Sequence, residues 1–187
     1  LDYNIYHLDD DDAWDSVNYN KESWPESMFI NTPLVANQGK YSDGLSILVY
    51  MDYEEVKEWA DTENTVGKPG ARPQAYLDFK KRKEEQVIKK VEKLFPDIRS
   101  KIKGVYSSTP LTFRDYIGNN DGSLYGMQKD YKSFMTTFVK PKTRIPNLYL
   151  TGQNMNLHGI LGVTISAFVT CFEFIDKKEL LDKVKNT

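Results

Sequence analysis

Three short apolar runs in the first third of the chain predict a small β-sheet. Residues 3–8 alternate loosely between apolar and polar, and residues 27–34 form a second run that ends at Pro33. The strongest strand pattern is LSILVY at 45–50, which follows the turn residues Ser42, Asp43 and Gly44. The pattern therefore places the strands before the middle of the chain.

Helical spacing dominates the centre of the chain. Residues 53–60 predict a short helix with Asp52 as its N-cap. A longer helix is expected from about 73 to 95, with Pro73 in its first turn, Pro96 ending it and residues 80–85 as its solvated face. Its apolar positions are Tyr76, Phe79, Val87, Ile88, Val91, Leu94 and Phe95.

The second half predicts an extended segment or a strand pair at 102–113 that Pro110 interrupts, a turn at 119–122, and an ambiguous stretch at 131–139. A strand at 148–151 and a terminal helix at about 162–185 follow. The first half of that helix is apolar nearly all round, so we expect it to be buried, whereas its lysine-rich end is expected to be exposed. The expected fold class is α+β, a β-sheet with flanking helices plus a terminal strand–helix unit.

Composition excludes several classes of function for this 187-residue chain. The net charge of −2 gives no electrostatic footprint for nucleic acid, so no nucleic-acid partner is expected. The single Cys171 excludes an internal disulfide framework and is expected to be a small buried hydrophobe. Residues 9–12 are four aspartates without the spacing of a calcium loop, and His7 is interpreted as structural. No metal site is predicted, and catalytic residues stay unknown.

The apolar runs do not predict a membrane span. The first twelve residues are polar and acidic, unlike a signal peptide, and the apolar stretch at 163–175 is too short to cross a bilayer. We expect a cytoplasmic location, with peripheral contact to the inner face of a membrane left open. Oligomeric state is left open as well.

The most informative stretch is 147–167, where a short apolar strand enters a glycine-bearing turn that opens onto the apolar helix. Such a junction directs unpaired backbone N–H groups and the positive end of the helix dipole at one point, where an anion or an electron-rich ring edge is favoured. Gly152, Gly159 and Gly162 are expected to let that ligand approach the backbone, with a tight turn and close helix packing as the alternative explanation.

Four separate pieces of sequence resemble the C-terminal part of the FAD-dependent phytoene desaturase, carotenoid isomerase and retinol saturase family. They are TPLTFRDY at 109–116, GSLYG at 122–126, IPNLYLTGQ at 145–153, and GILGV at 159–163 leading into Ser166 and Ala167. The order and spacing of the four pieces carry the resemblance. The first 100 residues are more weakly similar to the substrate-binding portion that precedes this region in the family.

The resemblance implies an apolar isoprenoid-like or retinoid-like substrate and hydride transfer at a carbon–carbon bond, by desaturation, saturation or cis–trans isomerisation. It implies FAD as the cofactor, with Gly152 and Gln153 beside the ribityl chain and phosphates. Gln153 or Asn154 would supply the hydrogen bond that many flavoproteins draw from an acid at this place. Gly159, Ile160, Leu161, Gly162 and Val163 would meet the pyrimidine edge of the flavin, where a helix N-terminus stabilises negative charge.

The glycine-rich G-x-G-x-x-G turn with which these enzymes begin is missing from this sequence. We therefore expect the C-terminal portion of a longer flavoenzyme, inactive as an isolated fragment. Residues 1–140 would belong to the substrate-binding domain, and residues 141–187 would be the last strand and helix of a Rossmann-like FAD domain. The alternatives are a stand-alone binding or interaction domain without a cofactor, and a flavin amine-oxidase-like enzyme with another substrate.

Several other residues allow both a structural and a functional interpretation. His158 lies in the turn and could face flavin or substrate, but a local backbone role is favoured. Arg114 and Asp115 interrupt an apolar stretch, and a structural role is favoured over the substrate channel. A set of aromatic residues could line a tunnel but is better explained as core and strand pairs: Trp14, Tyr19, Trp24, Phe29, Tyr50, Tyr53 and Trp59.

Overall fold

The computed structural model describes residues 4–9, 18–32, 42–127, 129–130 and 132–186. These residues form two compact units, the first ending at Gly122 and the second beginning at Ser123. Each unit is described by itself. The predicted boundary at 140/141 lies inside the second unit, and the assignment of these parts to a substrate domain and a FAD domain stays a prediction.

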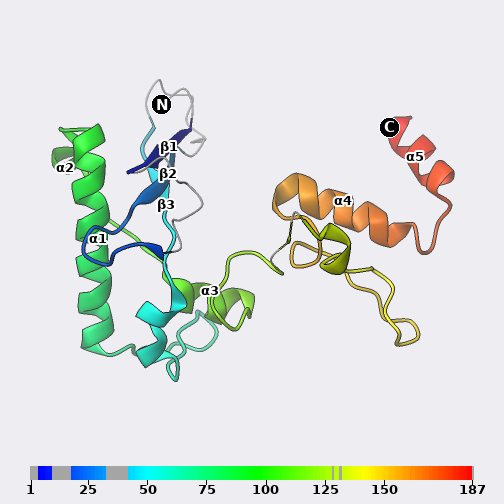
Figure 1. Ribbon diagram of the computed structural model, residues 1–187, viewed down its shortest axis with the longest axis horizontal. Coiled ribbons are helices and arrows are strands. Elements are labelled where there is room, and N and C mark those ends of the chain that lie inside the picture. Colours follow the sequence, from blue (N-terminus) through cyan, green and yellow to red (C-terminus); the bar gives the residue numbers. More distant parts are fainter. Residues whose placement is uncertain (1–3, 10–17, 33–41, 128, 131, 187) are drawn as a thin grey trace. The chain divides into compact units, whose positions relative to one another are not determined.

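The first unit contains the predicted sheet. Strands β1 (Ile5–Leu8), β2 (Ser27–Asn31) and β3 (Ser46–Leu48) lie in that order and pair antiparallel, with Tyr6 opposite Phe29 and Phe29 opposite Leu48. All three strands were predicted, although each is shorter than its apolar run. Met28 and Ile30 on β2 are buried on one face of the sheet, where they pack with Val91 of the long helix α1 (Figure 1). The alternate apolar residues of β2 therefore point toward α1.

Helix α1 (Gln74–Leu94) confirms the predicted central helix. Pro73 is its N-cap rather than its first helical residue, and the helix ends just before Pro96, because proline cannot continue it. The predicted solvated face is wrong at one position. Lys83 is only 7% exposed, and its ammonium pairs with the buried carboxylate of Glu55 at 2.7 Å. An aliphatic stem and a buried partner let a lysine lie inside.

A second part of the core surrounds the start of α1. The predicted helix at 53–60 is two 3₁₀ turns, η2 (Tyr53–Glu55) and η3 (Lys57–Trp59), and the Asp52 carboxylate caps the first by accepting from the Glu54 N–H, as expected. Val56 and Trp59 are buried there with Phe79 of α1. Trp24 is also buried, Tyr50 is 44% exposed, and Trp14 lies outside the described residues. The predicted aromatics are thus divided between core and surface.

The extended segment predicted at 102–113 is wrong in its last four residues. A short helix α2 (Ile98–Lys101) comes before it, and α3 (Pro110–Ile117) occupies its end. Thr109 and Thr112 form a reciprocal capping box, and Pro110 stands in the first turn, where its missing N–H costs nothing. The proline that looked like an interruption of a strand is a helix start. Leu111 on α3 is fully buried in the core.

The second unit holds η4 (Phe134–Thr136), α4 (Gly159–Cys171) and α5 (Lys177–Lys185). The strand predicted at 148–151 is reduced to one bridge between Lys142 and Tyr149. The single terminal helix predicted at 162–185 is two helices, because Asp176 caps a new helix through the N–H groups of Lys178 and Glu179. Helix α4 also begins three residues earlier than the apolar pattern indicated.

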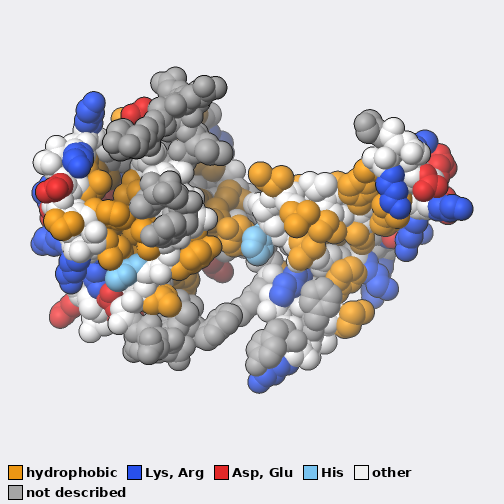
Figure 2. Space-filling model, turned by 90° about the horizontal axis from the view of Figure 1, so that it is seen from above, with side chains coloured by type: hydrophobic (Ala, Val, Ile, Leu, Met, Phe, Trp, Pro, Cys, Tyr) orange, Lys and Arg blue, Asp and Glu red, His pale blue; other side chains and the backbone are white. Residues whose placement is uncertain are grey.

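The expected burial of the first half of the terminal helix is also wrong. Only Gly162 and Ser166 of α4 are buried, while Ile160 is 93% exposed and Leu161 is 74% exposed. Hydrophobic side chains accordingly gather over α4 on the face seen in Figure 2. Cys171, expected to be buried, is half-buried. In the part of the chain that the structure describes, no helix is long and apolar enough to cross a membrane.

Candidate functional site

Two of the three glycines in the turn before α4 have backbone conformations that favour glycine. Gly152 has a φ of +106° and Gly159 a φ of +74°, both in the left-handed region where a Cβ is strained. A Cβ at either position would meet no atom within 4 Å, so neither glycine is required by a close neighbour. Backbone conformation accounts for both glycines, and the space beside them is open to a ligand.

Gly162 differs from the other two glycines. A Cβ there would lie 2.7 Å from the carbonyl carbon of Leu157 and 2.8 Å from its Cβ. Close packing of helix against turn, the alternative explanation, therefore accounts for Gly162, and its contact with the cofactor stays a prediction. Gly162 contributes to the shape of the turn, because it lets Leu157 lie directly on the helix.

The remaining predicted contact residues lie along the turn and the first turn of α4. Gln153 is half-buried and Asn154 is exposed. Ile160, Leu161 and Val163 are all exposed, Val163 at 39%. The structure thus places the predicted residues in one continuous segment, and every one of them except Gly162 has exposed or partly exposed surface.

The N-terminus of α4 carries no side-chain cap. His158 is the N-cap residue, but its imidazole makes no capping hydrogen bond. The first N–H groups of this helix therefore keep the partial positive charge of a free helix end. The backbone role favoured for His158 is wrong, because its ring instead stacks on Tyr125, with centroids 4.1 Å apart and planes inclined by 29°.

Two parts of the resemblance that are separate in the sequence meet at this turn. Tyr125 stacks on His158, and a Cβ on Gly126 would lie 2.3 Å from the Cα of Asn154. The GSLYG piece therefore packs against the turn, which sequence reasoning did not predict. The only sequence signal for it was the glycine beside an aromatic residue within a piece that already resembled the family.

Asn156 is a second residue that the sequence did not single out. Its side-chain oxygen accepts from the Val139 N–H at 2.8 Å, and its side-chain nitrogen donates to the Val139 carbonyl at 2.7 Å. This pair of bonds imitates a strand pairing and ties the turn to the preceding segment. Met155 beside it is only 6% exposed and anchors the turn from inside.

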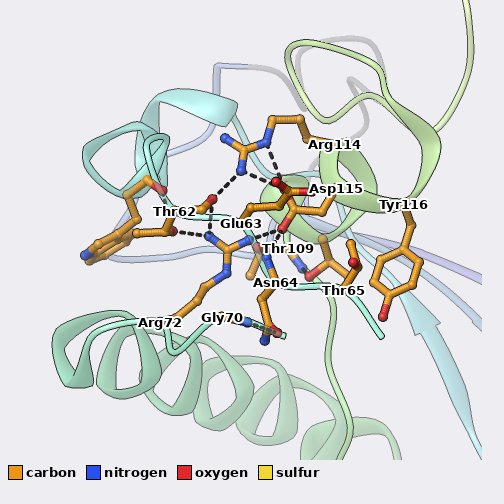
Figure 3. A network of polar contacts seen from close by, with 12 residues as sticks. Thr62, Glu63, Asn64, Thr65, Gly70, Arg72, Thr109, Arg114, Asp115 and Tyr116 are labelled. Atoms are coloured by element: carbon orange, nitrogen blue, oxygen red, sulfur yellow. Dashed lines mark hydrogen bonds and ion pairs between the residues drawn. The ribbon is translucent and has the colours of Figure 1, made fainter. Parts of the chain in front are cut away.

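The charged residues Arg114 and Asp115 belong to a different, structural cluster in the first unit (Figure 3). The Asp115 carboxylate, 1% exposed, pairs with Arg72 and with Arg114, whose Nη2 lies 2.6 Å from it. Arg114 also donates to the carbonyls of Ala60 and Thr62, both at 2.5 Å. Burial by itself would lower the pKa of Arg114, but its hydrogen bonds to Asp115 and Tyr53 raise that pKa. Because the cluster ties the 60–72 loop to α3, the favoured structural role is confirmed.

A shallow hollow of about 510 Å³ also lies in the first unit, with Glu54, Glu55, Trp59 and Phe79 among its lining residues. Two of its carboxylates are already engaged: Glu54 pairs with Lys57, and Glu55 pairs with Lys83. Burial and the hydrogen bond to Glu55 raise the pKa of Tyr19 above its ordinary value, so this phenol stays protonated as a donor. Among the described residues, no group of three or more His, Cys, Asp or Glu could hold a metal ion.

Comparison with known proteins finds relatives but no matching family model and no significantly matching solved structure. An all-trans-retinol 13,14-reductase of Danio rerio is 30% identical over 161 residues, which are 84% of this chain and 24% of that protein. The human and rat proteins of the same name are each 31% identical, over 75% and 73% of this chain and 22% of their own length. The chain thus spans about a quarter of the length of the curated relatives it matches. The retinol saturase branch of the expected resemblance is confirmed: by sequence, the chain is related to the all-trans-retinol 13,14-reductases.

Proposed function

We propose that this chain is part of a flavin-dependent oxidoreductase that acts on a carbon–carbon bond of a retinoid or isoprenoid substrate. The observation that carries the proposal is the similarity, over most of this chain, to proteins named for reducing all-trans-retinol. Saturation is the direction that those names favour over desaturation or isomerisation. FAD dependence rests on the resemblance together with the geometry of the turn before α4.

The turn fits a flavin in two respects. Gly152 and Gly159 leave open space beside a backbone that carries no Cβ, and the uncapped N-terminus of α4 favours a partially negative ring edge. Gly152, Gln153 and Asn154 would lie beside the ribityl chain and phosphates, and Gly159, Ile160, Leu161 and Val163 beside the ring. A bound flavin would supply the hydride transfer that amino-acid side chains cannot perform, while these residues bind and orient it.

The exposed surface of α4 favours a longer protein over a stand-alone binding module. Ile160 and Leu161 are 93% and 74% exposed next to a turn that resembles a cofactor site. Contiguous exposed apolar residues of this kind are typical of an interaction surface. We infer that this chain alone binds FAD weakly or not at all, and a flavin absorption band from the purified 187-residue chain would contradict that.

The test is to sequence the gene upstream of the Leu1 codon, express any in-frame extension together with this chain, and purify the product. We expect a visible flavin absorption band and, without oxygen, reoxidation of the reduced flavin when all-trans-retinol is added. A product without bound flavin, or a start codon directly before Leu1, would refute the proposal. A flavin band without any response to retinol would refute only the substrate.

Two glycine variants give a matched control. Gly152→Ala and Gly118→Ala each place a Cβ on a left-handed glycine that has no neighbour within 4 Å, but Gly118 is the C-cap of α3 in the first unit. Both substitutions carry similar backbone strain, roughly 1–2 kcal/mol. We expect loss of flavin from Gly152→Ala and retention in Gly118→Ala. Equal loss from both variants would show an effect of stability alone.

A further inference from the structure

Helix α4 contacts the preceding turn through one row of small residues. Gly162, Ser166 and Thr170 are spaced four residues apart, so they share one face of the helix. Gly162 meets Leu157, as described above. Ser166 and Thr170 carry hydroxyl groups, and both hydroxyls bond to backbone groups of the segment that leads into the turn.

Ser166 holds both polar backbone groups of Gly152. Its hydroxyl oxygen accepts from the Gly152 N–H at 3.2 Å and donates to the Gly152 carbonyl at 3.3 Å. Ser166 is only 7% exposed, so water does not compete freely for these bonds. Gly152 has a φ of +106°. Because glycine has no Cβ, its local sterics allow many other backbone conformations as well. The serine hydroxyl therefore fixes one of the several backbone orientations that are open to glycine.

Thr170 holds Leu150, which lies two residues before Gly152. Its hydroxyl lies 3.1 Å from the carbonyl of Leu150 and 2.9 Å from the carbonyl of Ser166, one turn back in its own helix. The spacing of the two hydroxyls along α4 thus matches the spacing of Leu150 and Gly152 along the incoming segment. Together they attach that segment to the helix at two points.

We propose that Ser166 and Thr170 are positioning residues that set the conformation of the Gly152 turn, and with it the approach of the cofactor to that turn. The proposal rests on the proposed function for its cofactor part. Neither hydroxyl lies within 4 Å of a Cβ built on Gly152, so neither borders the open space there, and both are engaged with the backbone. They act through the peptide that they hold and would not touch the cofactor themselves.

Thr164 offers a matched control on the same helix. Its hydroxyl donates to the carbonyl of Ile160 at 2.8 Å, one turn back, just as that of Thr170 reaches Ser166. Thr164 differs in that it is exposed and bonds within α4. Thr164→Val and Thr170→Val remove the same hydroxyl at constant shape, but only the second removes a bond to the incoming segment.

The first measurement is amide hydrogen exchange in the 187-residue chain. We expect the Gly152 N–H to exchange about fivefold faster in Ser166→Ala, the size of one lost hydrogen bond. Thr170→Val should accelerate exchange in the 150–155 segment, Thr170→Ser should restore it, and Thr164→Val should leave it unchanged. Unchanged exchange in both Ser166→Ala and Thr170→Val would overturn the proposal, as would the same acceleration in Thr164→Val.

The second measurement is the FAD dissociation constant of the flavin-loaded product described above. We expect it to rise about fivefold in Ser166→Ala, if the turn loses one fixed hydrogen bond, and to recover in Ser166→Thr. Faster exchange without any change in FAD affinity would overturn the cofactor part. If the product carries no flavin at all, the proposed function fails, and hydrogen exchange alone decides whether the two hydroxyls hold the turn.

Discussion

Helices α1 and α4 use their surfaces in opposite ways. Helix α1 directs Tyr76, Phe79 and Val91 into the core and leaves most of its charged residues outside. Helix α4 instead packs its small row, Gly162, Ser166 and Thr170, against a turn and exposes Ile160 and Leu161. The comparison teaches that apolar character alone does not say which face of a helix packs. A small face that brings backbones close can be the buried one.

The largest effect is expected from the buried ion cluster that α3 shares with the 60–72 loop. Asp115→Ala leaves Arg72, whose side chain is 5% exposed, without its carboxylate, and removing one partner of a buried pair costs about 3–5 kcal/mol. Urea unfolding followed by tryptophan fluorescence measures this, because Trp24 and Trp59 are buried in the first unit and the second unit contains no tryptophan. A loss below about 1 kcal/mol, the range of an exposed pair, would show that the cluster is hydrated.

The next prediction compares one apolar deletion in each unit. Leu111→Ala removes a fully buried side chain and should cost about 2–5 kcal/mol, whereas Ile160→Ala removes one that is 93% exposed and should stay within about 0.5 kcal/mol. The measurement is urea unfolding, followed by circular dichroism for the second variant. A large cost for Ile160→Ala would mean that α4 is covered in solution and would break the comparison.

A smaller effect is expected from filling the small face of α4. Gly162→Ala places a Cβ 2.7 Å from the Leu157 backbone, and overpacking of this kind costs about 1–3 kcal/mol. Val163→Ala, at the neighbouring position with 39% exposure, is the control and should cost less. Hydrogen exchange over residues 152–171 reports the difference. Equal exchange in the two variants would contradict the packing role of the small row.

The smallest effect concerns the solvated face of α1. Hydrogen bonds from Arg99 lower the pKa values of Glu85 and Glu92 below their ordinary value of 4.5. A carboxylate whose pKa is lowered on folding stabilises the fold at pH values above its ordinary pKa. This contribution is lost as the pH falls through the folded-state pKa. Arg99→Gln should therefore raise both pKa values, measurable by NMR titration, and flatten the loss of stability below pH 4.5. Unchanged pKa values would mean that the ion pairs are absent in solution.

The sequence predicted the elements that local signals specify, and it failed where context decided. The strands of the first unit and α1 followed from periodicity, and the Asp52 cap was predicted from residue type. Helix α3 was missed because Pro110 was interpreted as a break, although Thr109 and Thr112 provided a capping box. The break between α4 and α5 was missed because Asp176 was not recognised as an N-cap. Both errors concern boundaries, where one residue type permits two structures.

The sequence predicted which segment forms the candidate site, but not which distant residues pack against it. The glycines at 152 and 159 indicated a turn that a ligand could approach closely, and the family resemblance indicated which cofactor to consider. Nothing in the spacing indicated that Tyr125 and Gly126 pack against His158 and Asn154, since those contacts join residues about thirty apart. Long-range contacts of this kind depend on how the chain closes and not on local periodicity.

By itself, the sequence determined the three strands of the first unit and the central helix, because local propensity and periodicity suffice for those features. The pieces that resemble the family also indicated to which proteins the chain is related. Only the tertiary structure decided which side of each helix is covered, that Lys83 is buried beside Glu55, and that Ser166 holds Gly152. Burial and hydrogen-bond partners depend on segments that are distant in the chain, so they are properties of the folded whole.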